Sequence, residues 1–239
     1  MKKIVSLISA LSLFVCLFSV SALADESTKN NQTASDFFIN FIENCFSDGN
    51  QLEVIDTNGN NVTDTVYNGF YSAYCNGNYS YILNYSLDNN LSLSRIWTVD
   101  DSQNISANNS QNLIGPNSMT EHKTVSHEKY YSRSESEHHR YVKEWTIIVA
   151  GTFYYNGNTY SILSSRTPTV SMGGPGWGAD FSPYMENASA WYTISSDKSS
   201  ITYYGRFETK CSLLVVLGDY PFGKILDYGS SYDSFSAQA

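Results

Sequence analysis

The four histidines are the residues with the clearest capacity for chemistry, because they lie close together in the sequence. All of them fall between positions 122 and 139, interspersed with glutamates. Imidazole nitrogens and carboxylate oxygens are both zinc-ligand types. The spacing nevertheless forms no His-Glu-x-x-His motif, and the adjacent His138 and His139 would point to opposite faces of a strand. We therefore predict a solvated, charged edge strand and no cofactor, and keep His127, His138, His139 and Glu137 only as alternative metal ligands.

The run from Asp56 to Asp64 begins like a calcium-binding loop, with oxygen-bearing side chains at alternate positions. The pattern then departs from the EF-hand, because Gly59 comes too early and Tyr67 stands where the loop requires a bidentate glutamate. We therefore predict a turn in which Asx side chains bond to nearby backbone amides.

Motifs of nucleophilic or nucleotide chemistry are absent from the sequence. It contains no Gly-x-Ser-x-Gly elbow, no Walker loop, and no cysteine with a histidine at a diagnostic spacing. Asp180 and Glu186 are the kind of acidic pair that a glycosidase uses, but their separation in space does not follow from the sequence. No catalytic residue is assigned, and the balance of these observations is against an enzyme.

Aromatic residues are the most informative feature, with 19 Tyr, 12 Phe and 4 Trp. Several tyrosines occur as doublets, in which one ring faces outward if the segment is a strand. Exposed Tyr and Trp rings combine rigid contact area with a polar group, as in protein interfaces and sugar-binding platforms. Ordinary β propensity with half-burial is the alternative explanation. The candidate ligand-binding residues are Tyr131, Tyr154, Tyr203, and Trp177 in the Gly-rich loop from Met172 to Gly178.

The N-terminus indicates a cleavable signal peptide over residues 1–24. Two lysines precede an apolar stretch from Ile4 to Val20, and small residues follow at Ala22 and Ala24. An uncleaved membrane anchor is the alternative, but no basic flank follows Ala24. We expect the mature chain to be secreted or retained at the cell envelope, with no stable membrane-spanning segment.

The mature chain is acidic. The sequence holds 14 Lys and Arg against 23 Asp and Glu, and two lysines lie in the signal peptide, so the mature formal charge is 12 minus 23, or −11. Nucleic acid is a poor partner for such a surface. The expected partner is an extracellular protein or glycan that the sequence does not identify.

Cys45, Cys75 and Cys211 remain after signal removal. An odd number of cysteines in an oxidising compartment allows at most one internal disulfide. Buried thiols that pack as small apolar groups are an equally good account, because a domain of this size does not need cross-links.

The mature sequence predicts one β-rich domain over residues 35–239, after a mobile tail over residues 25–34. Ser35 or Asp36 begins a short helix whose apolar residues share one face, and the helix ends before Gly49.

Short apolar segments separated by turn residues follow this helix. Asn-Gly pairs beginning at positions 58, 68, 76 and 156 predict tight turns. Residues 100–117 lack periodicity and indicate a long loop or a connector between lobes. The whole pattern favours an antiparallel β-sandwich or open barrel with one short N-terminal helix. Strands are expected at 79–85, 91–99, 142–155, 159–165, 190–194, 201–210 and 211–217.

Four segments of the C-terminal part, at 151–160, 167–170, 194–198 and 218–223, are similar to segments of uncharacterised exported proteins of Gram-positive bacteria. The resemblance implies export and a β fold, and it carries no known activity.

We therefore expect a secreted or surface-associated, non-enzymatic protein that binds its ligand with an aromatic-rich strand face. One alternative is a membrane-active protein, bacteriocin-like or toxin-like, suggested by alternating Ser and charged residues in the polar segment Thr124 to Tyr141. That segment is too charged for a lipid-facing strand. The other alternative is an extracellular hydrolase, in which the histidines or an acidic pair would converge in a pocket.

Overall fold

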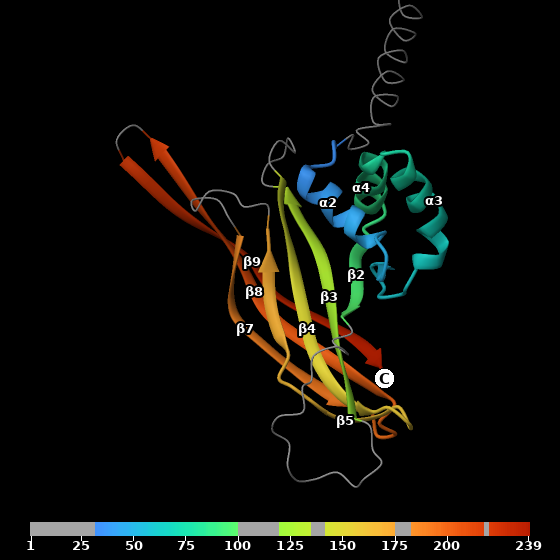
Figure 1. The fold of residues 1–239 in the computed structure, drawn as a ribbon. Coiled ribbons are helices and arrows are strands. Elements are labelled where there is room, and N and C mark those ends of the chain that lie inside the picture. The colour runs from blue at the N-terminus through green and yellow to red at the C-terminus, as the bar shows by residue number, and fades with distance from the viewer. Residues whose placement is uncertain (1–31, 100–119, 135–141, 175–182, 218–219) are drawn as a thin grey trace, which may run out of the picture.

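The computed structural model describes residues 32–99, 120–134, 142–174, 183–217 and 220–239. Within these residues the chain forms nine strands in two antiparallel sheets, so the predicted mainly β, antiparallel fold is confirmed (Figure 1). Three helices accompany the sheets where the sequence predicted one: α2 (Asp36–Cys45), α3 (Thr63–Cys75) and α4 (Tyr79–Asp88). None of the helices in the described residues has the length and apolar character needed to cross a membrane.

The larger sheet, sheet A, has the strand order β1-β2-β3-β4-β5, and β6 also pairs with β4. The smaller sheet, sheet B, has the order β7-β8-β9. The strands of sheet A are β1 (Asn50–Ile55), β2 (Ser92–Val99), β3 (Thr120–Ser134), β4 (Val142–Asn156), β5 (Ser161–Ser165) and β6 (Thr169–Gly173). Those of sheet B are β7 (Pro183–Ile194), β8 (Ser200–Leu217) and β9 (Tyr220–Gln238).

Helix α2 forms as the sequence predicted. Ser35 is the N-cap, and its Oγ accepts a hydrogen bond from the backbone N of Phe38 at 3.0 Å. Phe38, Phe41, Ile42 and Cys45 make up its buried face. Residues 32–34, expected in a mobile tail, are instead held against α4, because the backbone N of Gln32 donates to Asn84 and that of Ala34 donates to Ser80.

Two sequence predictions between residues 63 and 88 are wrong. The segment 79–85 is not a strand but part of α4, and Asn68-Gly69 lies inside α3 rather than in a hairpin. Buried residues recur with the helical period in both segments, at Val66, Phe70 and Ala73 in α3. In α4 the polar and aromatic residues also alternate, but burial of Ile82 and Leu83 against the other helices favours the helix.

The remaining turn and strand predictions mostly agree with the structure. Gly59 and Gly77 occupy turns with φ of +82° and +65°, and Asn156-Gly157 ends β4 before the return strand β5. Segments 201–210 and 211–217 form the single strand β8, and β6 extends into the expected loop as far as Gly173. The expected loop at 100–117 lies outside the described residues.

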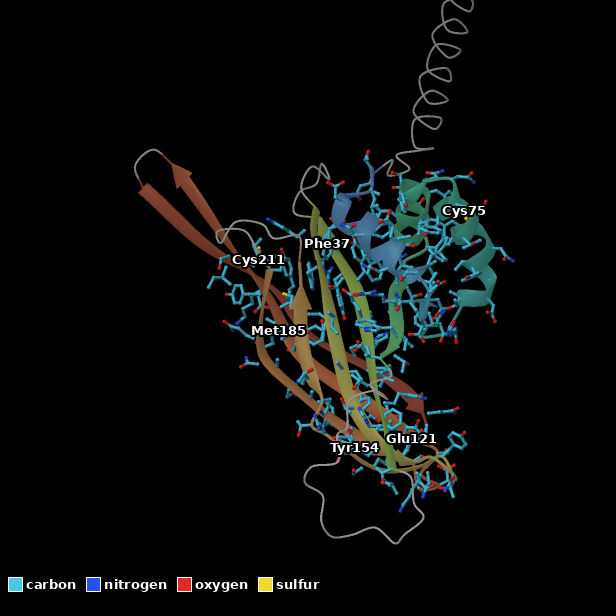
Figure 2. The ribbon with its side chains drawn as sticks, viewed as in Figure 1. Phe37, Cys75, Glu121, Tyr154, Met185 and Cys211 are labelled. Atoms are coloured by element: carbon cyan, nitrogen blue, oxygen red, sulfur yellow. The ribbon has the colours of Figure 1, made fainter. Side chains whose placement is uncertain are left out.

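Sheet A is covered on both faces. The helices pack on one face of β1, β2 and β3, and sheet B packs on the opposite face (Figures 1 and 2). The helical layer buries a core built from Phe38, Ile42, Phe70, Ile82, Leu52, Val54, Leu93 and Tyr130. The interface between the sheets buries Val149, Phe153, Ile162, Ile201, Tyr203 and Phe235, with a neighbouring cluster of Trp145, Ile147 and Phe207.

Two glycines allow the sheets to approach closely. A Cβ at Gly151 of β4 would clash with the ring of Tyr203 of β8. A Cβ at Gly205 would lie 2.8 Å from Val149 and 2.9 Å from Val170. Each sheet therefore places a glycine beneath a larger side chain of the other, so the interface is shaped by reciprocal packing.

Candidate functional site

The outer face of sheet B carries three aromatic side chains from three adjacent strands, which we call the aromatic patch: Trp191 of β7, Tyr204 of β8 and Tyr232 of β9. The ring centroids of Trp191 and Tyr204 lie 5.4 Å apart with planes inclined by 14°. The ring centroid of Tyr232 lies 6.1 Å from that of Trp191 and 6.0 Å from that of Tyr204. Trp191 is 41% exposed and Tyr232 is 54% exposed, so the cluster forms one continuous solvent-facing surface.

Strand register brings these rings together. Trp191 pairs with Tyr204 across β7 and β8, and Arg206 pairs with Tyr232 across β8 and β9. Side chains at these positions share one face because successive residues of a strand point to opposite faces. The intervening residues Tyr203 and Asp233 face sheet A and are buried.

Polar side chains surround the aromatic patch. Thr193 Oγ1 lies 3.2 Å from the Tyr204 hydroxyl, and Thr202 Oγ1 lies 2.9 Å from Ser236 Oγ. Arg206, which pairs with Tyr232 across β8 and β9, is exposed and forms no ion pair among the described residues. The surface therefore combines rings with hydroxyl groups and one guanidinium donor.

The structure describes three of the four predicted ligand-binding residues, and these three lie in different environments. Tyr203 is 0% exposed, so the expectation that it faces outward is wrong. Tyr131 lies between the sheets, where its ring stacks on Trp145 at 5.7 Å. Tyr154 is half-buried near His122 and Arg166 (Figure 2), and Trp177 lies outside the described residues.

His127 is buried between the sheets rather than on a solvated edge. Its Nδ1 lies 2.8 Å from Oδ2 of Asp233 on β9, and its Nε2 makes a less well aligned contact of 3.3 Å with Oε2 of Glu53 on β1. The ring also stacks on Phe235 with centroids 5.4 Å apart. We call this cluster the histidine clamp, because it joins β1 and β3 of sheet A to β9 of sheet B.

The electrostatics of the histidine clamp favour a protonated imidazole. Burial alone would lower the pKa of His127, but the hydrogen bond to Asp233, the contact with Glu53 and the charges of both carboxylates outweigh burial and raise it to about 9. The interaction with His127 lowers the pKa of Glu53 against the opposing effect of burial. Ser94 Oγ also donates to Glu53 Oε2 at 3.2 Å.

The histidine clamp has the composition of an ion-pair triad and not of a metal centre. Both nitrogens of His127 face carboxylates, and no group of three His, Cys, Asp or Glu side chains in the described residues is arranged to hold a metal. Of the other residues proposed for metal or acid–base chemistry, His138, His139, Glu137 and Asp180 lie outside the described residues, and Glu186 on β7 forms an ion pair with Lys210 at 2.6 Å.

Two further buried carboxylates lie on sheet A, and one of them, Glu144, connects the sheet to helix α2. Glu144 accepts hydrogen bonds from Tyr130 OH at 2.5 Å and from Ser35 Oγ, the cap of α2. Burial and the Glu144 charge raise the pKa of Tyr130. Glu128 pairs with Arg95 at 2.6 Å, and the Arg95 guanidinium lies 4.3 Å from the centre of the Trp97 ring.

The Asp56 loop is an Asx turn, as the sequence predicted. Asp56 Oδ1 accepts from the backbone N of Asn58 and of Asn60, each at 2.8 Å. The hydrogen bonds from Asn60 lower the pKa of Asp56. Among the cysteines, Cys45 and Cys211 are buried, whereas Cys75 is exposed on α3 (Figure 2).

Comparison with protein-family models, with curated proteins and with solved structures finds no match to this chain. Sequence reasoning anticipated an aromatic strand face but missed all three residues of the aromatic patch. The doublet Tyr203-Tyr204 was the available signal, and only the register shows which ring faces outward.

Proposed function

We propose that this protein is a secreted or surface-held binding protein, and that the aromatic patch contacts a glycan. The observation that supports the proposal best is the cluster of Trp191, Tyr204 and Tyr232 on one exposed sheet face. Exposed apolar patches with a polar rim mark protein, membrane or ligand interaction sites.

The composition of the face favours a glycan over a protein. A sugar ring presents an apolar C–H face and a rim of hydroxyl groups, which aromatic rings and polar side chains complement respectively. Around the aromatic patch the outward residues of β7, β8 and β9 are Ser189, Thr193, Thr202, Arg206, Ser234 and Ser236, without aliphatic side chains. The fully buried core of a protein interface is more apolar than the remaining surface, whereas the residues around these rings are polar.

The acidic character of the chain bears on the kind of glycan. A mature formal charge of −11 disfavours strongly anionic polysaccharides. Neutral or weakly charged polysaccharides are therefore the preferred ligands, with Arg206 as a hydrogen-bond donor at the edge of the aromatic patch.

The proposal can be tested with purified mature chain and a panel of insoluble polysaccharides: cellulose, xylan, chitin and peptidoglycan sacculi. Depletion from solution identifies the ligand, and calorimetry with a soluble fragment gives the dissociation constant. Trp191→Ala and Tyr232→Ala should each weaken binding by about 1–2 kcal/mol, or about 5- to 30-fold.

The matched control is Tyr81→Ala, which removes a tyrosine of α4 that is 44% exposed. We expect it to bind like the wild type. Equal losses in Tyr81→Ala, unchanged binding in both patch variants, or failure of the whole panel to bind would reject the glycan assignment.

A further inference from the structure

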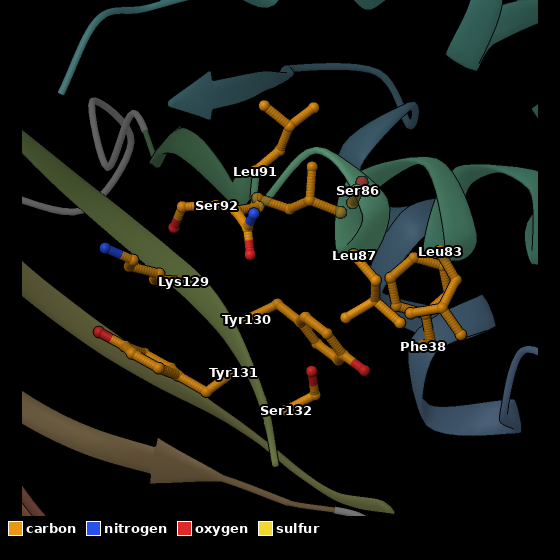
Figure 3. Close-up of a pocket in the computed structure, with 12 residues that line it drawn as sticks. Phe38, Leu83, Ser86, Leu87, Leu91, Ser92, Lys129, Tyr130, Tyr131 and Ser132 are labelled. Carbon is orange, nitrogen blue, oxygen red and sulfur yellow. The ribbon is translucent and has the colours of Figure 1, made fainter. Parts of the chain in front are cut away.

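A half-open cavity of about 330 Å³ lies between α4, the beginning of β2 and the edge of β3 (Figure 3). Its apolar walls come from Phe38, Leu83, Leu87, Leu91, Leu93 and Tyr130. The volume is at the lower end of the range for small-ligand sites. The cavity shares no residue with the aromatic patch, so its function is independent of the proposed glycan binding.

The strand lengths explain why the cavity exists. β2 begins at Ser92 and its first pair with β3 is Ser94 with Lys129, whereas β3 continues to Ser134. Beyond Lys129 the edge of β3 has no β2 neighbour. The turn after α4, in which Asn90 has a φ of +51°, leaves the space between helix and strand edge open.

One wall of the cavity contains a polar group without a partner. Leu83, Ser86 and Leu87 share one face of α4 by their spacing, and all three line the cavity. Ser86 is 5% exposed, and its Oγ has no hydrogen-bond partner. Leaving a buried hydroxyl unsatisfied is unfavourable, and a serine hydroxyl can either donate or accept.

The charge around the cavity indicates an uncharged ligand. Among the lining residues that the structure describes, Lys129 is the only charged one, and Figure 3 shows its ammonium group extending to the opposite side of β3 from the Tyr130 ring. An ionised ligand group inside the cavity would be desolvated without a counter-charge there. A ligand group that bonds to Ser86 would therefore be a neutral hydroxyl or carbonyl group.

We propose that this cavity binds a small, uncharged amphiphile: an alkyl chain or ring with one hydroxyl or carbonyl group that hydrogen-bonds to Ser86. With about 30 Å³ for each heavy atom, the volume that one water occupies in the liquid, the cavity accommodates about ten heavy atoms. 1-Octanol is a probe of this size and chemistry.

The test compares 1-octanol, octanoate and octylamine binding to the mature chain at neutral pH by calorimetry. 1-Octanol should bind, and the two charged analogues should bind at least about tenfold more weakly. Ser86→Ala should weaken 1-octanol binding about three- to tenfold, because it removes the hydrogen bond. Ser72→Ala, at an exposed position of α3, is the matched control and should bind normally.

The thermal unfolding of Ser86→Ala provides a second readout. Removing an unpartnered buried hydroxyl should leave the unfolding temperature unchanged or higher while binding falls, which a purely structural serine would not show. The proposal is overturned if the wild type does not bind 1-octanol, if octanoate binds equally well, or if Ser86→Ala keeps full affinity.

Discussion

The histidine clamp makes the stability of this protein depend on pH in a defined direction. The folded-state pKa of His127 is raised from 6.5 to about 9, so folding favours the protonated imidazole. A group with a raised folded pKa contributes its full stabilisation below the unfolded value of 6.5. That contribution decreases as the pH rises and is lost once the pH passes about 9.

The magnitude follows from the two pKa values. The difference between 6.5 and about 9, at about 1.36 kcal/mol per pH unit, corresponds to about 3 kcal/mol of unfolding free energy. His127 is 3% exposed, so screening by solvent reduces this value little. On the acid side, Glu53 has a lowered pKa, and its contribution is present above its ordinary value of 4.5 and is lost as the pH falls.

The assay is urea denaturation of the wild type and of His127→Gln at intervals from pH 5.5 to 9. The wild type should lose about 3 kcal/mol between pH 6.5 and 9 through this one group. His127→Gln should be less stable at pH 6, because it leaves Glu53 and Asp233 without their cation, and its profile should be flatter. The two curves should converge toward pH 9.

His122→Gln is the matched control, because His122 lies on the same strand and is only half-buried. Its curve should run parallel to that of the wild type. A wild-type stability that is constant from pH 6.5 to 9, or the same slope in His127→Gln, would refute the protonated clamp.

Three further predictions concern packing, buried hydrogen bonds and thiol access. Gly151→Ala should destabilise the fold by about 1–3 kcal/mol in thermal or urea unfolding, because the added methyl group meets the Tyr203 ring. Gly174→Ala is the control and should have little effect, because a Cβ at that position meets nothing within 4 Å. Glu144→Leu should cost about 2–3 kcal/mol, since Tyr130 and Ser35 lose their acceptor; an unchanged urea midpoint would argue against that network. In the native protein a thiol reagent should modify Cys75 rapidly and Cys45 only on unfolding, and Cys75→Ser should remove the fast phase.

The local patterns of the sequence specify several elements correctly. Ser35 and the apolar spacing after it define α2, and Asn156-Gly157 marks the end of β4. The Asx turn at Asp56 also follows from nearby residues alone. In each case the interactions that form the element are short-range, so the residue types and their spacing are sufficient to predict where the element lies.

Helix α4 shows where local patterns stop being sufficient. Its tyrosines, serines and leucines fit a strand by alternation, whereas the spacing of the buried Ile82, Leu83 and Ser86 fits a helix. The choice depends on burial against Phe38 and Phe70, residues that belong to other helices. Local propensity could not resolve it, because the deciding energy comes from tertiary packing.

The sequence by itself determined the mainly β composition, the acidic charge and the abundance of aromatic side chains. Only the tertiary structure decided which aromatic rings face solvent, because that depends on strand register and on which faces of each sheet are covered. Tyr131 is enclosed because β3 packs on both faces, whereas Tyr204 is in the aromatic patch because the outer face of sheet B is uncovered by the described residues. His127 likewise meets Glu53 and Asp233 only when three strands distant in sequence come together, so its protonation is a property of the assembled sheets.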